Sequence, residues 1–299
     1  MSNLSKRSEE STVQFFLIVV FSIFCLTTVF PFLNVLARSF TPGEIMMVKK
    51  VILLPLEPTI DNYRVIFSDP MLLSALLISV LRTVIGALAA MLVMSLAAYA
   101  MSKRSLKGRK VIMILLLIPM YFGAGMIPSY INVVKLGLIN NFMVYILPGL
   151  FTGFNFLLIM SYFSQLPASY EESAHLDGAS YFRIFLSVII PLSKPILATI
   201  ALFCAVGQWN AWFDALLYVN RSSLLPLQYV LQNIIKLNSF EFLAQQAKSG
   251  DTSALFRYNF SAESISSAAM VFTIIPILFV YPFLQKYFVK GISLGGIKG

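Results

Sequence analysis

The sequence predicts an all-α integral membrane protein with six membrane-spanning helices, and three observations support this fold class. The chain of 299 residues is 58% hydrophobic and only 12% charged, whereas soluble proteins carry about a quarter charged residues. Its mean hydropathy is +0.82. The apolar residues also gather in runs of about 20 or more, which is long enough for a helix to cross the hydrocarbon core of a bilayer.

Six such runs, taken in chain order, define the predicted spans. The first follows a short tail with Lys6 and Arg7 and in this respect resembles a secretory signal. It is about 25 residues long, whereas the apolar part of a signal peptide has roughly 7–15, so we expect a span that is retained. Pro31, Pro119, Pro128 and Pro148 lie within or near spans and can kink them. The six spans are 13–37, 71–101, 111–134, 142–165, 193–217 and 264–285.

The distribution of basic residues predicts the orientation of these spans. Segment 102–110, between the second and third spans, contains five basic residues and no acidic one, which is typical of a cytoplasmic loop. We therefore expect the tail 1–12 to be cytoplasmic and, after six crossings, the tail 289–299 as well. The net charge of +9 comes from residues at the ends of apolar runs. Because no basic polar domain is formed, nucleic acid is not an expected partner.

This orientation places two longer segments, 38–70 and 218–263, on the extracytoplasmic side. The second segment contains a leucine-rich stretch, Leu224 to Ile235, which we expect to form a short helix. That helix would either cap the bundle or help to dock an external partner.

Side chains that usually build metal or redox sites are scarce. The two cysteines, Cys25 and Cys204, lie in apolar runs, where cysteine behaves as a small hydrophobic residue. His175 is the one histidine, and the sequence has no Cys/His cluster with the spacing of a zinc site. We expect neither a disulfide nor a metal site.

The segment between the fourth and fifth spans, 166–191, predicts a helix, a turn and a second helix. Ser169 and Glu172 have the spacing of a capping box at a helix start, and Gly178 is expected to end this first helix. Ser180 would cap the second helix, which ends at Pro191. Its expected apolar stripe is Tyr181, Phe182, Phe185, Leu186 and Ile189. The first helix has about two turns, too few to be stable alone, so it needs a packing partner such as a groove on a cytoplasmic protein.

The same segment resembles the EAA loop of importer-type ABC permeases. The resemblance is carried by Glu172-Ser173-Ala174, then Gly178, then Ile190-Pro191. Ser173 departs from the family's second alanine, but serine is also small. Further matches indicate the carbohydrate-uptake branch, closest to the maltose-type inner permeases and their oligosaccharide-specific relatives in Gram-positive bacteria. These matches are Asp177 to Ser180, Pro191 to Pro195, Gln208 to Asp214, and the tail from Lys286 to Gly299.

The resemblance covers most of the chain and implies the type I ABC importer permease fold, with a permease core at 71–288. The implied function is alternating-access import of a carbohydrate, an oligosaccharide in this branch, across the bacterial cell membrane. The sequence has no G-x-x-x-x-G-K-[ST] segment, so this chain is expected to be non-catalytic and without a cofactor of its own. ATP and Mg would be bound by partner ATPase subunits. The other implied partners are a second permease subunit, an extracellular solute-binding lipoprotein, the carbohydrate substrate and the lipid bilayer.

By the same resemblance, the first helix of segment 166–191 would contact an ATPase and pass its motion into the fifth span. An ordinary amphipathic surface helix is the alternative. The tail 289–299 would either reach between the ATPase subunits or fray. The residues assigned to ATPase coupling are Glu171, Glu172, Ser173, Ala174, Asp177, Gly178, Arg183 and Pro191.

Candidates for the substrate path gather in the fifth span. Sugars are held by aromatic rings and by polar side chains, and Trp209 and Phe213, or Asn210 and Asp214, share a face at helical spacing. The tryptophans could instead be interfacial anchors. Charged groups inside a membrane normally face protein or a water-filled path, although Arg82 could snorkel outward. The candidates are Trp209, Asn210, Trp212, Asp214 and Arg82, with Tyr121, Phe122, Asn155 and Tyr162 as weaker ones.

Two other functions compete with this interpretation. An ion-coupled secondary transporter usually needs several titratable groups near the bilayer midplane and often an internal repeat. A membrane-embedded enzyme needs a catalytic constellation, which one histidine and almost no buried acid pair do not supply. The sequence favours neither.

Overall fold

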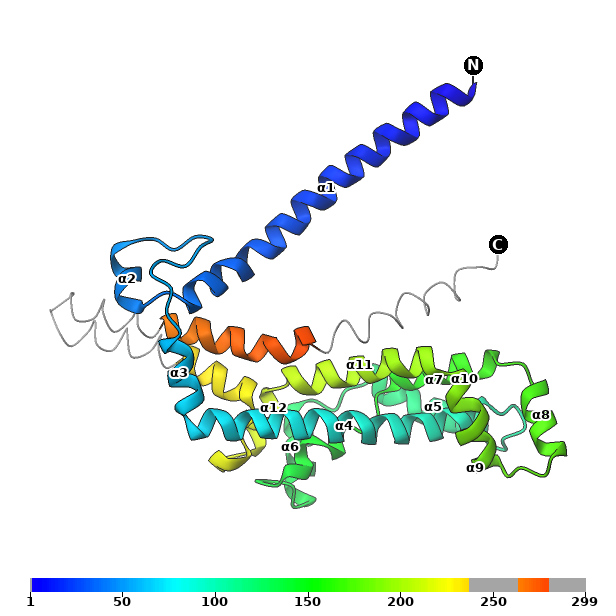
Figure 1. The fold of residues 1–299 in the computed structure, drawn as a ribbon. Coiled ribbons are helices and arrows are strands. Elements are labelled where there is room, and N and C mark those ends of the chain that lie inside the picture. Colours follow the sequence, from blue (N-terminus) through cyan, green and yellow to red (C-terminus); the bar gives the residue numbers. More distant parts are fainter. Residues whose placement is uncertain (1, 237–262, 280–299) are drawn as a thin grey trace. The chain divides into compact units, whose positions relative to one another are not determined.

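A computed structural model describes residues 2–236 and 263–279, and within these ranges the regular structure is helical, without strands (Figure 1). The chain divides into two compact units. The first contains Met1–Asp69 and Asn233–Ile274, and the second contains Pro70–Gln232 and Ile275–Gly299. The predicted all-α fold is thus confirmed for the described residues. The predicted tail 289–299 lies outside them, as do residues 237–262 of the second extracytoplasmic segment.

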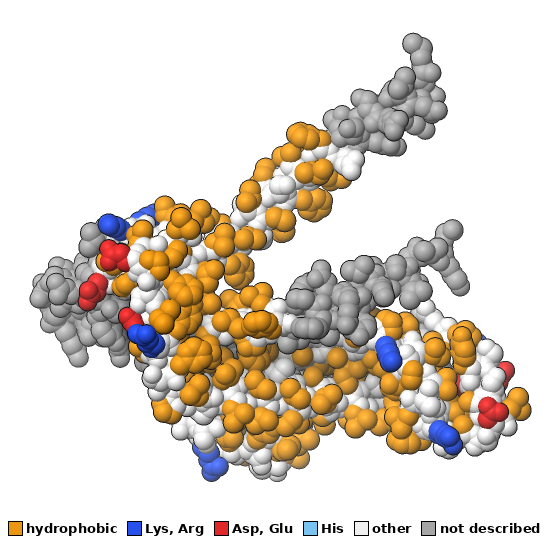
Figure 2. All heavy atoms as spheres, viewed as in Figure 1, with side chains coloured by type: hydrophobic (Ala, Val, Ile, Leu, Met, Phe, Trp, Pro, Cys, Tyr) orange, Lys and Arg blue, Asp and Glu red, His pale blue; other side chains and the backbone are white. Residues whose placement is uncertain are grey.

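The first unit begins with α1 (Ser2–Ser39), which contains the predicted first span. Its apolar stretch from Val13 to Ser39 is unbroken although Pro31 lies inside it. Figure 2 shows hydrophobic side chains along this helix, and most of them are exposed. A long helix with an exposed apolar surface on all sides is suited to a lipid environment rather than to water.

Buried polar contacts join the end of α1 to α3 (Asp61–Ser68) and to the start of helix Glu263–Phe279. The Asn62 amide donates to the carbonyl oxygens of Ser39 and Thr41, at 2.9 and 3.2 Å, and Ser264 Oγ donates to Asn62 Oδ1 at 3.2 Å. Arg38 forms an ion pair of 2.6 Å with Glu263. A short helix, α2 (Gly43–Val48), completes the described helices of segment 38–70. The first unit therefore brings the ends of both predicted extracytoplasmic segments together.

Among the described residues of the second unit, only α4 (Pro70–Ser102) is a long unbroken span. The third predicted span is divided into α5 (Arg109–Tyr121) and α6 (Met126–Lys135), which are bent by 117°. The fourth comprises the 3-10 helices η1 (Phe142–Tyr145) and η2 (Leu147–Gly149), bent by 50° from α7 (Gly153–Gln165). Gly125, at φ 82°, makes the first of these bends possible, since few other residues adopt positive φ.

The remaining elements follow the predicted loop and the fifth span. They are α8 (Ser169–Leu176), α9 (Tyr181–Ile184), the π-helical turn η3 (Phe185–Ile189), α10 (Ile190–Leu192), α11 (Lys194–Asn210), α12 (Phe213–Tyr218) and η4 (Ser222–Leu224). A helix over 227–236 follows, which confirms the helix expected in the leucine-rich stretch. The sixth predicted span begins one residue early, at Glu263, and is described as far as Phe279.

The core of the second unit ties the loop helices to the spans. Met94 of α4, Phe156 of α7, Ile184 of α9 and Ile200 of α11 are fully buried in one hydrophobic cluster. Ala174 of α8 packs against the same cluster. A core shared in this way allows a displacement of the loop helices to reach several spans, because close-packed interiors transmit strain.

Candidate functional site

The start of α8 differs from the predicted capping box. Ser169 is the first residue of the helix, Ala168 precedes it in an α-helical conformation, and no side chain caps this end. The amides of Tyr170 and Glu171 instead donate to the carbonyl oxygens of Pro167 and Ala168, at 3.3 and 3.0 Å. A backbone turn thus satisfies donors that a side chain was expected to satisfy, so the capping-box prediction is wrong.

The end of α8 and the following cap agree with the prediction. Gly178 has φ 78°, and the amide of Ala179 donates to the carbonyl oxygen of Ala174 at 3.0 Å, which is a glycine-terminated helix end. The Ser180 hydroxyl accepts a hydrogen bond from the Arg183 amide at 3.4 Å. These two residues set the turn between α8 and α9.

The side chains of α8 face in two directions. Ala174 points to the core cluster, and the Glu171 carboxylate forms an ion pair with Lys103. Glu172, Ser173, Asp177 and Gly178 are exposed. Leu176 is 89% exposed, which is extreme for an aliphatic side chain in a helix. The sequence did not predict the exposure of Leu176, because an apolar residue in a short amphipathic helix is usually expected to be buried. The available signal was that Leu176 lies four residues after Glu172 and therefore on the same face of the helix as that acid.

The second helix also departs from its predicted stripe. Ile184, Phe185 and Ile189 are buried, whereas Tyr181, Phe182 and Leu186 are exposed, as are Arg183 and Pro191. The π-helical turn η3 adds a residue to one turn, and this shifts the register of the buried face. The helix continues past Pro191 to Leu192, and an 85° bend at Ser193 separates it from α11.

A second cluster of charged and polar groups surrounds Arg82 in the middle of α4. The Arg82 side chain is only 1% exposed. Its Nη2 and Nη1 donate to the two carboxylate oxygens of Asp214 at 2.5 and 3.3 Å, and Nη1 also donates to the carbonyl oxygen of Ala211 at 3.1 Å. Nε and Nη2 donate to Gln208 Oε1 at 3.2 and 3.1 Å. All five N–H donors of the guanidinium are thereby used.

The other neighbours of Arg82 complete this cluster, which we call the Arg82 cluster (Arg82, Tyr145, Gln208, Ala211 and Asp214). The guanidinium lies over the ring of Tyr145, 4.2 Å from its centroid, a favourable cation–π arrangement. The Gln208 amide donates to the carbonyl oxygen of Tyr145 at 3.0 Å. Arg82 therefore joins α4, η1, α11 and α12.

Gln208 fits only because two neighbouring residues are glycines. A Cβ atom on Gly86 would lie 2.8 Å from Gln208 Nε2, and one on Gly149 would lie 3.3 Å from the same atom. The first distance is shorter than any normal contact. Gly86 and Gly149 thus provide the space that lets Gln208 reach Arg82 and Tyr145 together.

The fifth span is not one continuous helix, so the expected face sharing between residues 209–210 and 213–214 is wrong. The break at Ala211 and Trp212 separates α11 from α12. Arg82 binds the Ala211 carbonyl that the break leaves without a helical partner, and Asp214 Oδ1 accepts from the Ala215 amide at 2.8 Å at the start of α12. A broken span of this kind is stable only where other groups satisfy its free backbone.

A cavity of about 280 Å³, lined by both polar and apolar residues, lies beside the Arg82 cluster. Of the substrate-path candidates, Arg82 and Asp214 line it, and so does Asn155, one of the weaker ones. Gln208 and Tyr218 also line this cavity and were not singled out from the sequence. The signal for Gln208 was its place in the family-like stretch from Gln208 to Asp214. Asp214 is 25% exposed and Arg82 is nearly inaccessible, so the cavity presents Asp214 more than Arg82.

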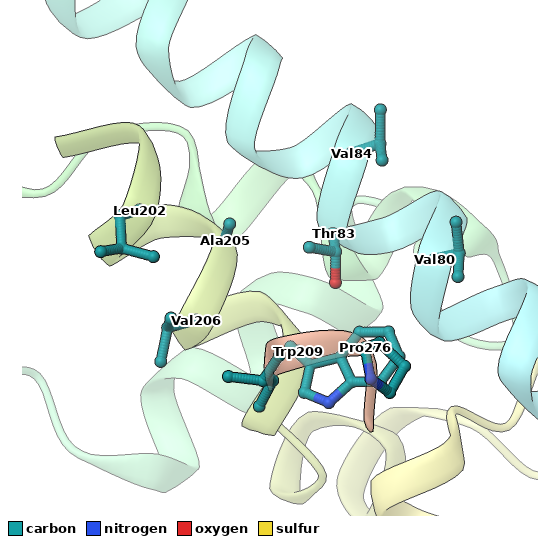
Figure 3. A pocket seen from close by; sticks show the side chains of 9 residues that line it. Val80, Thr83, Val84, Leu202, Ala205, Val206, Trp209 and Pro276 are labelled. Carbon is teal, nitrogen blue, oxygen red and sulfur yellow. The ribbon is translucent and has the colours of Figure 1, made fainter. Parts of the chain in front are cut away.

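The other three candidates lie elsewhere. Trp209 lines a separate, largely apolar pocket of about 180 Å³ (Figure 3). The other lining residues are Val80, Thr83 and Val84 of α4, Leu202, Ala205 and Val206 of α11, and Pro276 and Ile277. Asn210 donates to the carbonyl oxygen of Val206, one helical turn back, at 2.9 Å. The Trp212 ring packs edge-on against Phe213. None of the three is among the residues that line the cavity beside the Arg82 cluster.

The chain has close sequence relatives among carbohydrate transport permeases. No family model matches the chain. It is 41% identical over 278 residues, 93% of this chain and 95% of the relative, to the polygalacturonan/rhamnogalacturonan transport system permease protein YtcP of Bacillus subtilis. The arabinooligosaccharides transport system permease protein AraQ of Halalkalibacterium halodurans is 26% identical over 98% of this chain and all of its own length.

A solved structure has the same fold. It is the crystal structure of a bacterial ABC transporter involved in the import of the acidic polysaccharide alginate, one chain of which is 34% identical to this chain. The match covers 94% of this chain and 98% of that one, with a TM-score of 0.83.

Proposed function

The chain belongs to the permease family of carbohydrate ABC importers, and we propose that α8 is the element through which partner ATPase subunits drive it. As a permease of such an importer it is not an ion-coupled secondary transporter. Its relatives are transport permeases. In our proposal this chain is non-catalytic, and ATP and Mg are bound by the ATPase subunits.

The geometry of α8 is the observation that carries the proposal. One side of the helix is fixed by Ala174 in the core and by the ion pair of Glu171, while Glu172, Asp177 and Leu176 remain exposed. A short helix that presents an apolar side chain between acidic ones is suited to a groove on a partner. Among the residues assigned to coupling, Glu172, Ser173 and Asp177 would contact the ATPase directly. Ala174, Gly178, Arg183 and Pro191 would set the position of α8 and its connection to α11.

The orientation is part of the same proposal. The ion pair between Lys103 and Glu171 holds segment 102–110 next to α8, which supports placing both on one side of the membrane. The basic residues of that segment favour the cytoplasm. The tails 1–12 and 289–299 would then be cytoplasmic, and segments 38–70 and 218–263 would be extracytoplasmic, around the permease core 71–288.

We propose an acidic oligosaccharide as the substrate. Two of the relatives are named for polygalacturonan and for the acidic polysaccharide alginate, and polygalacturonan is a polymer of uronic acids. The donors of Arg82 are already used within the chain, so Asn155 and Tyr218 would be this chain's polar contacts along the path. The carboxylate of Asp214, also at this cavity, is neutralised by Arg82 and would not repel an acidic substrate as a free acid would. The partners would be a second permease subunit, two ATPase subunits and an extracellular solute-binding lipoprotein.

Co-purification of the assembled transporter from its native membrane tests this proposal. The wild-type chain should retain an ATPase in detergent, and Leu176→Glu should lose most of it, because a charge would have to enter the partner's groove. Leu186→Glu is the matched control, since Leu186 is also an exposed leucine of the loop helices but lies outside α8. Retention of the ATPase by the Leu176→Glu protein would contradict the assignment of α8.

The substrate is tested separately with proteoliposomes that contain the complete importer. Oligogalacturonates should stimulate ATP hydrolysis and should be taken up, while neutral oligosaccharides of the same length should do neither. Stimulation by neutral oligosaccharides alone would contradict the proposed substrate class but not the role of α8.

A further inference from the structure

Lys103 has a contact that its place in a basic loop does not predict. It follows the end of α4 directly, in the segment that serves as an orientation signal. Its ammonium group forms an ion pair with the Glu171 carboxylate of α8, 68 residues further along the chain. The two side chains are only 24% and 21% exposed, so water and salt screen this pair less than a pair on the open surface.

The Lys103 ammonium group also lies over an aromatic ring. Its Nζ atom is 4.2 Å from the ring centroid of Tyr99, which is on the last turns of α4 and is almost buried. A cation above an aromatic face is attracted by the negative charge density of that face. The ring of Tyr99 in turn lies 5.4 Å from that of Phe185, a buried residue of η3. Lys103 is therefore held from two sides, by α8 and by the end of α4.

These contacts give Glu171 a different surrounding from that of its neighbour Glu172. The Glu172 side chain is exposed, whereas the Glu171 carboxylate is bound within the chain. An acid that is already paired with a lysine of its own chain is a poor candidate for a contact to a partner protein. Glu171 is better suited to fixing the angle of α8 on the body of the permease.

We propose that Glu171, Lys103 and Tyr99 form a strut that positions α8 on the end of α4. The strut rests on the proposed function, in which ATPase subunits move α8. It gives that motion a direct route into α4, in addition to the route through α9, η3 and α10 into α11. Because Tyr99 contacts Phe185 of η3, the two routes meet in the same core cluster. In this scheme Lys103, Tyr99 and Glu171 are positioning residues and do not contact the substrate.

The test uses the complete importer in lipid nanodiscs or proteoliposomes, with its ATPase, its binding protein and an oligogalacturonate. Lys103→Met and Glu171→Gln each break the strut with little change in size. Each should lower the number of substrate molecules transported per ATP hydrolysed at least threefold, while the ATPase still co-purifies. Lys103→Arg keeps a cation that can pair with the acid and lie over the ring, so it should restore most of the wild-type ratio.

Arg104→Met is the matched control, because Arg104 is the exposed next residue of the same basic segment. It removes one positive charge without touching the strut and should keep the wild-type ratio. A ratio for Lys103→Met equal to that for Arg104→Met would overturn the strut. If the ATPase no longer co-purified with the Lys103→Met or Glu171→Gln protein, the strut would also be overturned, because these residues would then be needed to bind the ATPase. Failure of the wild-type protein to retain an ATPase would instead contradict the proposed function itself.

Discussion

The α8 helix and the Arg82 cluster hold charged side chains in opposite ways. In the Arg82 cluster every guanidinium donor is used within the chain, and the ion pair with Asp214 lies in the interior of the bundle. On α8 one acid is paired, while a second acid and an aliphatic side chain are exposed. The first arrangement stabilises one shape of a broken span. The second leaves groups free to bind something else.

The difference shows that a charged residue inside a membrane protein can have a structural role and need not contact the substrate. A charge inside the membrane usually indicates a substrate or ion pathway. Here Arg82 instead satisfies a backbone carbonyl and a carboxylate at the break between α11 and α12. The exposed face of α8 carries the stronger indication of function, because its acid Glu172 and its aliphatic side chain Leu176 are exposed. Three substitutions, each with a control, test this contrast.

The largest effect is expected from Gly178→Asp, at the end of α8. Gly178 has φ 78°, where a side chain strains the backbone slightly, but an added Cβ meets no atom within 4 Å. A side chain there should therefore leave the folded chain nearly intact but would intrude on the ATPase contact. We expect substrate-stimulated ATP hydrolysis to be abolished while the protein still inserts into the membrane, as measured by ATPase assay and by detergent-solubilised yield.

Gly137→Asp provides the control for this substitution. Gly137 has φ 68° and also has no atom within 4 Å of an added Cβ, so the backbone cost should be similar, about 1 kcal/mol. The Gly137→Asp protein should keep normal stimulation. Equal losses in both variants would mean that backbone strain, and not the position of Gly178, explains the defect.

A smaller but still large effect is expected from Arg82→Met. Removal of the guanidinium leaves the Ala211 carbonyl without a donor and Asp214 without its cation, with the Ala215 amide as its remaining hydrogen bond. Breaking a buried ion pair costs about 3–5 kcal/mol. The melting temperature of the purified protein should fall clearly. Arg64→Met is the control, because the pair of Arg64 and Asp61 is about 70% exposed and should contribute at most about 1 kcal/mol.

The double variant Arg82→Met with Asp214→Asn sharpens this result. It removes the unpaired charge, so part of the lost stability should return if the pair is structural. A protein with Arg82→Met that melts like wild type but no longer transports would contradict the structural role of Arg82 and favour a substrate contact.

The smallest effect is expected from Gly86→Ala. The new Cβ would meet Gln208 at 2.8 Å, so the amide must move and its bonds to Arg82 and Tyr145 must weaken. We expect a loss of about 1–3 kcal/mol, the usual cost of overpacking, measured by thermal unfolding in detergent. Gly207→Ala is the control, since an added Cβ meets nothing within 4 Å there and alanine favours a helix. A stable Gly86→Ala protein would mean that Gln208 tolerates displacement.

The sequence was sufficient to predict the helical class, the positions of the apolar helices and the turn at Gly178, because long apolar runs and a glycine at a helix end have direct physical causes. Prolines indicated kinks in the third and fourth spans, and both spans are bent. The sequence could not predict the break in the fifth span, since this break depends on distant partners. The break at Ala211 needs Arg82 from another helix, and the π-helical turn at 185–189 depends on which residues pack in the core. Local spacing therefore gave the wrong face for Asp214.

The same limit applies to the side chains of the loop. Glu171 and Glu172 are adjacent and chemically alike, and the family resemblance assigned both to ATPase coupling. Their different surroundings come from Lys103, which approaches α8 from the end of α4. The exposure of the Leu176 side chain likewise depends on which face of α8 packs against the core.

Site-specific cross-linking from position 176 is the most direct test of whether α8 binds the ATPase. Leu176→Cys is introduced into a chain in which Cys25 and Cys204 are replaced by serine, and the new thiol is coupled to a photoreactive probe in the assembled importer. The ATPase subunit should be captured in high yield, and a probe at position 186 should capture little of it. Capture of lipid, or of no ATPase, from position 176 would contradict the coupling role of α8.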